Sequence, residues 1–288
     1  MSKAESFDIL FVDQCQAISP PTPNDIDGSE VLLNETSGTR VVRIQQQFVI
    51  KYGVHVEPVE AHNMLYVAKS TTVPVPRVYA IYQRQEKSKQ KSVTYIVMQY
   101  VPGTTLLNLW NTLKQDRKSS IAKTLRTYFD QLRQLQHPGY LGNVNGGPPL
   151  DDLFSETQLA DDIQAPFRTE EELVECILRI YAVETGKRMA HKARYYQEVL
   201  PTALYSNNPP VFTHNDFQRK NIIVQDDGTL VIIDWEFASW YPIYWEYSTA
   251  TWANGGWNDD WHDYVRVALD NYPHQSLWLS SMKLEMWS

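Results

Sequence analysis

The chain has 288 residues, of which 43% are hydrophobic, a length and composition typical of one large domain or two compact lobes. Its formal net charge of −8 argues against general binding to nucleic acid or to an anionic membrane surface. No apolar run approaches the roughly 18 residues that a transmembrane helix needs. The start of the chain, interrupted by Asp8 and Asp13, lacks the basic region of a secretory signal. The two cysteines, Cys15 and Cys176, are too few for a disulfide framework or a cysteine-based metal site. We therefore expect a cytoplasmic monomer without nucleic-acid or membrane partners.

The N-terminal part has the pattern of short strands and one helix. Residues 1–30 are expected to form an irregular lead-in, because residues 17–29 are rich in proline, aspartate and serine. Residues 57–69 carry apolar side chains near helical spacing, and Pro58 is tolerated in a first helical turn. The β-rich runs predict strands at residues 40–44 and 48–52, joined as a hairpin, and at residues 77–82 and 93–100.

Beyond residue 102 the pattern is mostly helical. A short β-rich passage returns near residue 211, where the turn Asp226-Asp227-Gly228 between two apolar runs predicts a hairpin. A mostly β part followed by a mostly helical part predicts an α+β fold. We expect a small antiparallel-sheet lobe with one helix over residues 31–101 and a larger helical lobe over residues 102–288. The expected helices lie at residues 104–115, 118–136, 169–184 and 187–200.

One stretch carries the residue types that phosphoryl transfer needs. His214, Asp216 and Asn221 form an H-x-D-x-x-x-x-N arrangement, and a later apolar run ends in Asp234. An acceptor hydroxyl needs a carboxylate that orients it and takes its proton. Magnesium on a triphosphate prefers hard oxygen ligands, such as a carboxylate and an amide carbonyl. We therefore predict Asp216 as the catalytic base and Asn221 and Asp234 as magnesium ligands, with the intervening hairpin folding Asp234 back beside Asn221. His214 is expected to brace the loop.

Taken alone, this motif has an ordinary explanation, because such spacings occur by chance and a histidine near a strand end is often a structural hydrogen-bonder. A distant pair of residues favours the catalytic interpretation. Lys51 ends an apolar β-rich run, and Glu60 lies nine residues later in the expected helix. A lysine that steadies phosphates needs a carboxylate to fix its flexible stem. Either residue alone would usually be a solvated surface charge.

Six stretches match landmarks of a known family: residues 49–53, 60–64, 73–78, 95–103, 214–221 and 233–236. On these landmarks, residues 31 to about 257 resemble the aminoglycoside phosphotransferase family, within the protein-kinase-like fold, and especially its fungal members. The resemblance implies a two-lobed small-molecule kinase with ATP and Mg²⁺ as cofactors. It also implies that the strand over residues 93–100 leads into the interlobe hinge, where the backbone of Gln99 and Val101 would hydrogen-bond the adenine.

Some positions depart from the family pattern. The expected nucleotide-covering loop, residues 34–40, contains only Gly38 and no G-x-G-x-x-G, so that phosphate contact would come from Ser37 or from the backbone at Gly38. Asn215 stands where relatives often have glycine, and residues 241–246 stand where many have Gly-Pro and an aspartate. None of these changes removes a residue that the chemistry requires.

The acceptor side has two interpretations. An aromatic and acidic cluster follows Asp234 and would suit a pocket for a ring or an organic cation, although such aromatics more often form the core of a helical lobe. Arg219 and Lys220 would neutralise phosphate charge or pair with nearby carboxylates. The cluster comprises Trp235, Glu236, Trp240, Tyr241, Tyr244, Trp245, Glu246, Trp252 and Trp257.

Other functions explain parts of the sequence. A pseudokinase that binds nucleotide without transferring phosphate would keep the same motif. An iron site of the 2-His-1-carboxylate type would use His214, Asp216 and His262, with Arg266 binding an acid, but His262 lies in a stretch with a helical pattern. A protein substrate is disfavoured because no A-P-E element follows Asp234.

The full set of residues therefore predicts an ATP- and magnesium-dependent phosphotransferase that moves the γ-phosphoryl group to a hydroxyl of a small molecule. In this prediction Lys51 steadies the phosphates and Glu60 positions Lys51. Aminoglycosides, choline-like amines, sugars, homoserine-like alcohols and secondary metabolites all remain open as acceptors, because fold does not settle function.

Overall fold

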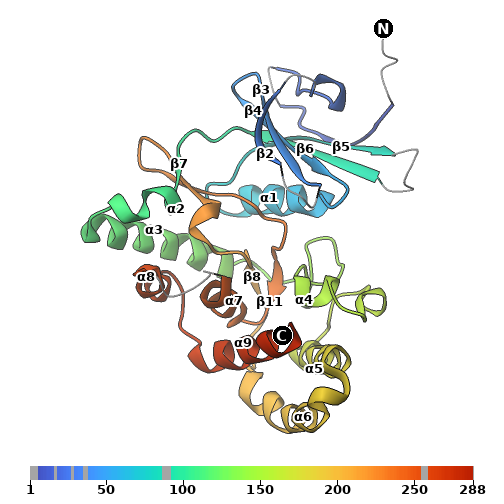
Figure 1. Ribbon diagram of the computed structural model, residues 1–288. Coiled ribbons are helices and arrows are strands. Elements are labelled where there is room, and N and C mark those ends of the chain that lie inside the picture. Colours follow the sequence, from blue (N-terminus) through green and yellow to red (C-terminus); the bar gives the residue numbers. More distant parts are fainter. Residues whose placement is uncertain are drawn as a thin grey trace. The chain divides into compact units, whose positions relative to one another are not determined.

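The computed structural model describes residues 6–15, 18–26, 29–34, 38–85, 92–253 and 259–287. The chain divides into two compact units, the first comprising Met1–Thr104 with Ile223–Glu236 and the second Thr105–Ile222 with Phe237–Ser288. The first unit is built on an antiparallel sheet and the second is mostly helical (Figure 1). The predicted α+β fold class is therefore confirmed. No helix in the described part of the chain is both long enough and apolar enough to span a membrane.

The first unit contains a six-stranded sheet in the order β1-β5-β6-β4-β3-β2, in which every neighbouring pair is antiparallel. The predicted hairpin between β3 and β4 is confirmed, and its turn places Gln45 and Gln46 at φ 53° and 61°, which suits the twist of a tight hairpin. The strands are β1 (Asp8–Val12), β2 (Glu30–Asn34), β3 (Arg40–Ile44), β4 (Phe48–Gly53), β5 (Val78–Gln85) and β6 (Ser92–Gln99).

The expectation of an irregular lead-in over residues 1–30 is wrong for β1, which forms an edge strand of this sheet. Ile9 pairs with Tyr82 of β5 and Val12 pairs with Ala80. The side chain of Ile9 is 64% exposed, so this strand buries little of its own apolar surface. The apolar run Ile9–Val12 was a usable strand signal, and backbone pairing with β5 completes the strand.

One helix, α1 (Pro58–Ser70), lies along a face of this sheet (Figure 1). Pro58 occupies the first helical turn, where its missing N–H costs no hydrogen bond. Thr71 caps the end of the helix, since its N–H and hydroxyl both donate to the carbonyl of Val67. The buried residues of the helix are Val59, Glu60, Ala61, Asn63, Met64 and Val67.

A small three-stranded sheet, in the order β10-β9-β7, corrects the expected lobe boundaries. The expected division placed residues 223–236 in the helical lobe, but they belong to the first compact unit. The backbone of this segment lies close to the backbone of residues 74 and 103. The N–H of Ile232 donates to the carbonyl of Pro74 at 3.0 Å. Gly103 (φ 142°) lies so close to Val224 that a Cβ on it would come within 2.4 Å of the Val224 carbonyl oxygen. The strands are β7 (Thr104–Thr105), β9 (Ile222–Val224) and β10 (Leu230–Ile232).

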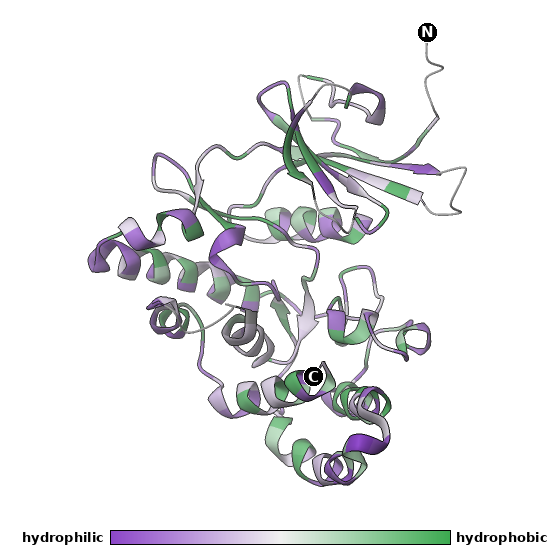
Figure 2. Ribbon diagram, in the orientation of Figure 1, coloured by the Kyte–Doolittle hydropathy of each residue, from purple (hydrophilic) through white to green (hydrophobic). Residues whose placement is uncertain are grey.

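The second unit is a group of helices that bury apolar side chains, with a two-stranded sheet of β8 (Val211–Thr213) and β11 (Ser239–Tyr241). Figure 2 shows hydrophobic and hydrophilic residues alternating along the turns of α3, as expected for a helix with one buried face. The expected helix over residues 104–115 is wrong in extent, since it is a short α-helix followed by a 3₁₀ turn at Trp110–Thr112. The helices are α2 (Leu106–Leu109), α3 (Gln115–Arg133), α4 (Asp152–Ser155), α5 (Glu170–Thr185), α6 (Ala190–Leu204), α7 (Trp245–Ala253), α8 (Trp261–Ala268) and α9 (Pro273–Met286).

The two cysteines differ in exposure, which predicts a difference in their reactivity. Cys176 lies in the core of the second unit, where burial raises the pKa of its thiol to about 11, whereas Cys15 is exposed. Because the thiolate is the nucleophile, iodoacetamide at neutral pH should alkylate Cys15 and spare Cys176 in the folded protein. Peptide mass spectrometry checks this, with the chain unfolded in guanidinium as a control in which both react. Equal labelling of both cysteines in the folded protein would contradict the burial of Cys176.

Candidate active site

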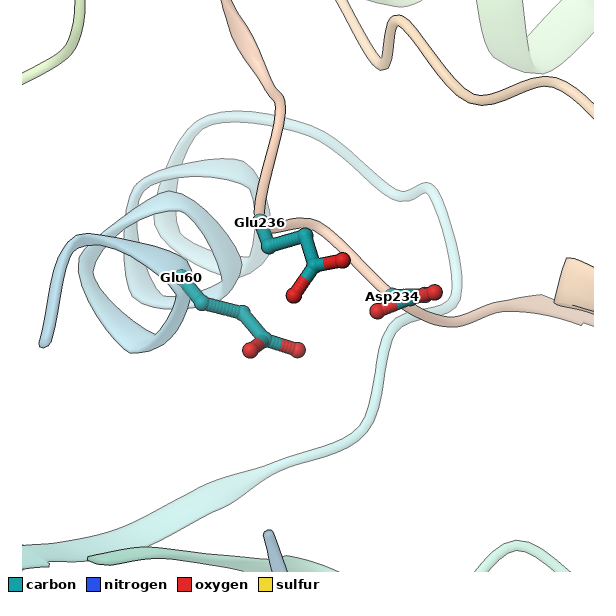
Figure 3. A group of neighbouring side chains, drawn as sticks. All are labelled: Glu60, Asp234 and Glu236. Carbon is teal, nitrogen blue, oxygen red and sulfur yellow. The ribbon is translucent and has the colours of Figure 1, made fainter. Parts of the chain in front are cut away.

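The first group of candidate residues lies in the first unit and centres on the ammonium of Lys51. Its Nζ lies 2.9 Å from an oxygen of Glu60, 2.8 Å from one of Asp234 and 2.8 Å from one of Glu236. Figure 3 shows the three carboxylates converging, one from α1 and two from the segment that follows β10. The structure therefore brings Lys51 and Glu60 together, as the sequence predicts, and adds two further carboxylates.

Local conformation explains why Asp234 and Glu236 reach the same ammonium. Asp234 has φ 66°, a left-handed conformation that aspartate tolerates better than most residues. The side chain of Trp235, between them, is fully buried and donates to the carbonyl of Ile232 at 2.9 Å. Asn63 of α1 donates to the carbonyl of Trp235 at 2.9 Å. These two hydrogen bonds fix the segment and leave its carboxylates on the Lys51 side.

The charges in this group perturb one another strongly. Burial disfavours the ammonium of Lys51, but the attraction of Glu60, Asp234 and Glu236 outweighs burial and raises its pKa. Burial raises the pKa of Glu60 to about 7, although the positive charge of Lys51 opposes this shift. With one ammonium among three carboxylates, the group carries a formal charge of −2 when all its members are ionised.

This donor set suits a divalent cation. The carboxylate oxygens of Glu60, Asp234 and Glu236 lie within 4.8 Å of one another, and carboxylates are the ligands that magnesium prefers. Glu60 is almost fully buried beside Lys51, whereas the side chains of Asp234 and Glu236 are 27% and 37% exposed. Asp234 and Glu236 are therefore the members that could hold a metal while Glu60 stays with Lys51.

The second group of candidate residues lies in the second unit, on the loop that follows β8. The amide Nδ2 of Asn221 donates to Asp216 twice, to the carboxylate Oδ2 at 2.7 Å and to the main-chain carbonyl at 3.0 Å. The side-chain amide of Gln218 donates to the other carboxylate oxygen of Asp216, and the ammonium of Lys220 lies 3.4 Å from Oδ2. Because Nδ2 of Asn221 is engaged with Asp216, its Oδ1 is the atom suited to bind a metal. Asp234 and Asn221 belong to different compact units, and the expectation that they lie side by side remains a prediction.

The loop is braced from within by its own histidine. His214 is buried, and its Nδ1 accepts a hydrogen bond from the N–H of Asp216 at 3.2 Å. This contact agrees with the expected role of His214 as a brace. The side chains of His214, Asp216 and His262 do not converge into an iron site. Among the described residues, one group of three histidine, cysteine or acidic side chains comes close enough to hold a metal ion, and it consists of Glu60, Asp234 and Glu236.

A buried carboxylate on α7 holds the same loop from outside. Glu246 accepts from the N–H of His214 at 2.7 Å and from that of Asn215 at 3.1 Å. Burial raises the pKa of Glu246, against the opposing effect of His214 and of Arg133. Glu246 thus supplies two hydrogen bonds that fix the backbone immediately before Asp216.

Replacing Glu246 by alanine should therefore destabilise the second unit and impair the loop. Two buried N–H groups would lose their acceptor, and each orphaned donor costs about 1–3 kcal/mol, so we expect a loss of about 2–6 kcal/mol in the free energy of unfolding. Urea unfolding followed by circular dichroism measures it. Glu198→Ala, at an exposed helical position on α6, is the matched control. A Glu246→Ala protein as stable as the control would show that these hydrogen bonds contribute little.

The expected adenine-binding segment, Gln99 and Val101, lies at the end of β6 and just beyond it. The N–H of Gln99 donates to the carbonyl of Arg77 at 2.8 Å, and that of Tyr100 donates to the carbonyl of Gln47 at 2.8 Å. An adenine contact by Gln99 would therefore have to use its carbonyl, with Val101 supplying an N–H. In the expected nucleotide-covering loop, Ser37 lies outside the described residues.

Most of the aromatic cluster after Asp234 belongs to the core rather than to an exposed pocket. Trp235, Trp240, Tyr241, Tyr244 and Trp245 are each at most 2% exposed. The core interpretation of these residues is therefore confirmed, while Trp257 lies outside the described residues.

The basic residues of the loop pair with carboxylates. Arg219 contacts Asp259 at 2.7 Å, and its guanidinium lies over the neighbouring rings of Trp110 and Trp261, 5.4 and 5.5 Å from their centroids. Of the two expectations for Arg219, pairing with a nearby carboxylate is the one that the structure shows.

Comparison with known proteins adds the family. The sequence profile of the phosphotransferase enzyme family matches residues 21–276, which is most of the chain. The chain belongs to the phosphotransferase enzyme family. None of the curated proteins matches the chain significantly in sequence.

Solved aminoglycoside phosphotransferases share the fold of this family member. The streptomycin–ATP ternary complex of APH(2″)-IIa is 14% identical, with 90% of this chain and 82% of that chain covered and a TM-score of 0.57. ADP-bound APH(2″)-Ib is 14% identical, with 88% and 80% covered and a TM-score of 0.55. APH(4)-Ia is 16% identical, with 90% and 79% covered and a TM-score of 0.54. These values establish a common fold, and the chemistry has to be argued from this chain's own residues.

Proposed function

We propose that this member of the phosphotransferase enzyme family transfers the γ-phosphoryl group of Mg·ATP to a hydroxyl of a small molecule. The observation that carries the proposal is the hydrogen-bonded pair of Asp216 and Asn221 on one braced loop. That pair offers a carboxylate to a hydroxyl and an amide oxygen to a metal, which are two requirements of phosphoryl transfer.

The residues divide the work as follows. Asp216 orients the acceptor hydroxyl and takes its proton as the hydroxyl oxygen attacks the γ-phosphorus. Lys51 neutralises phosphate charge, and Glu60, 2.9 Å from its ammonium, fixes the direction of its stem. Asn221 and Asp234 would hold magnesium, which when bound neutralises charge on the phosphates. The backbone of Gln99 and Val101 would bind the adenine.

Two observations support ATP as the nucleotide and a divalent cation as the metal. Similar folds have been solved with ATP or ADP, in APH(2″)-IIa and APH(2″)-Ib. In this chain, the formal −2 charge around Lys51 and the exposure of Asp234 and Glu236 favour a divalent cation.

The acceptor class is a small hydroxylated molecule. Structures of similar fold contain streptomycin, gentamicin or hygromycin B, all in aminoglycoside phosphotransferases. The net charge of −8 suits a cationic acceptor of this kind. We place the enzyme in the cytoplasm, in keeping with its two unpaired cysteines, and we expect it to act as a monomer.

An ATP-consumption screen tests the proposal. The purified protein, Mg²⁺ and ATP are mixed with a library of aminoglycosides, amino alcohols, sugars and hydroxylated secondary metabolites, and ADP release is recorded. Acceptor-dependent ADP release that Asp216→Ala lacks is the expected result. Stabilisation of the protein by Mg·ATP without turnover of any acceptor would instead favour the pseudokinase alternative.

A further inference from the structure

Asn215, immediately before the proposed base, has an unusual backbone conformation and a dense set of contacts. Its φ is 67°, in the left-handed region that asparagine tolerates better than most residues. Its side-chain Nδ2 lies 3.1 Å from Oδ2 of Asp151, 3.1 Å from the carbonyl of Leu150 and 3.3 Å from the hydroxyl of Tyr241. A glycine would adopt this backbone conformation readily, but it would make none of these side-chain contacts.

Asp151 is built into the interior of the second unit. It is 6% exposed, and its Oδ1 accepts the N–H of Leu153, which caps the start of α4. The indole N–H of Trp245 lies 3.4 Å from Oδ2, and the ammonium of Lys283 lies 3.4 Å from Oδ1. Lys283, on α9 and with 13% of its side chain exposed, is the counter-ion for this buried carboxylate.

Two buried carboxylates therefore hold Asn215 from different elements. Glu246 of α7 binds its main-chain N–H at 3.1 Å, and Asp151 binds its side chain at 3.1 Å. The next peptide group sets the direction of Asp216, so a shift of Asn215 is passed directly to the base. Catalysis is sensitive to such shifts, since a misplacement of about 1 Å costs about a hundredfold in rate.

We infer that Asp151, with Lys283 as its counter-ion, is a positioning residue for Asp216 that acts through the side chain of Asn215. The inference rests on the proposed function for its catalytic consequence. Its structural consequence, a stiffer loop around Asp216, stands independently of turnover. The C-terminal helix α9 thereby contributes to the catalytic loop through one buried ion pair.

The test compares Asn215→Gly with Asn207→Gly. Asn207 also has a left-handed backbone (φ 53°) but is exposed on the loop after α6, so the control makes the same chemical change at the same backbone conformation. Hydrolysis of Mg·ATP with water as acceptor gives kcat and KM, and hydrogen exchange of the peptide over residues 211–222 reports loop stiffness. Asn215→Gly should lower kcat about tenfold with KM for ATP changed less than twofold, and should speed exchange in that peptide. Asn207→Gly should change neither.

A double-mutant cycle tests whether Asp151 acts through Asn215. Asp151→Asn keeps an oxygen that can cap α4, since asparagine is also a good N-cap residue. If the route runs through Asn215, the double variant should lose no more activity than Asn215→Gly alone. Additive losses in the cycle, or wild-type kcat and exchange in Asn215→Gly, would overturn the inference. Absence of hydrolysis in the wild type would count against the proposed function, and the exchange data would still decide whether Asp151 and Asn215 hold the loop.

Discussion

Replacing Asp216 by asparagine is expected to lower phosphoryl transfer by about 10²–10⁴-fold, the range that a general base contributes. The substitution keeps the size of the side chain but removes the proton-accepting carboxylate. Asn221 and Gln218 now donate to different carboxylate oxygens of Asp216, so one of them would keep the amide oxygen as acceptor and the other would face the new NH2 group. The affinity for Mg·ATP should change little, because Lys51 and Asp234 are left in place, whereas the lost acceptor should cost the loop about 1–3 kcal/mol.

Steady-state kinetics and calorimetric titration with Mg·ATP separate these two effects. Asp161→Asn, at an exposed position in the same unit, is the control for the loss of one negative charge. Near-normal turnover in Asp216→Asn would contradict its assignment as the base. A large loss of nucleotide affinity with normal kcat would instead assign Asp216 to metal or nucleotide binding.

Replacing Lys51 by methionine should have the largest effect in the first unit. Three carboxylates would lose their common ammonium, and removing one partner of a buried ion pair costs about 3–5 kcal/mol. The same change should weaken Mg·ATP binding, because Lys51 is proposed to neutralise phosphate charge. Chemical unfolding and calorimetry measure the two effects. Lys69→Met, exposed on α1, is the control, and equal stability of the two variants would show that the carboxylates do not need Lys51.

The stability lost in Lys51→Met should depend on pH in a defined direction. The pKa of Glu60 in the folded protein is already raised to about 7, from an ordinary value of 4.5, and removing Lys51 would raise it further. The folded state then binds a proton more tightly than the unfolded state, so the folded variant loses stability as the pH rises above 4.5. Lys51→Met should therefore be less impaired at pH 5.5 than at pH 8. The opposite trend would mean that the ionisation of Glu60 is not the cause of the stability lost in Lys51→Met.

Local patterns were sufficient for the elements that carry most candidate residues. The β-rich runs of β3 and β4 and the helical spacing of α1 predicted where Lys51 and Glu60 lie, and the structure places their charged atoms 2.9 Å apart. Both elements form from short-range signals, namely a hairpin and a proline-initiated helix. Their pairing could be anticipated because the spacing from strand to helix is short.

Contacts between distant segments explain what the sequence did not reveal. β1 pairs with β5, although the irregular composition of residues 17–29 led us to expect a lead-in over the whole of residues 1–30. Glu236 joins Lys51 because Trp235 is buried and turns the flanking carboxylates to the same side. Asp151 meets Asn215 across more than sixty positions in the chain. No periodicity reports such encounters, although an acidic residue two positions after Asp234 was a usable signal for Glu236.

The most direct test of the central claim is the mass of the acceptor after reaction with Mg·ATP. With a hydroxylated acceptor found by the ATP-consumption screen, mass spectrometry should show the gain of one phosphoryl group on a hydroxyl, together with stoichiometric ADP. Asp216→Asn should give neither product above background over the same time. ADP formation with an unmodified acceptor, or equal phosphorylation by the Asp216→Asn protein, would contradict the account.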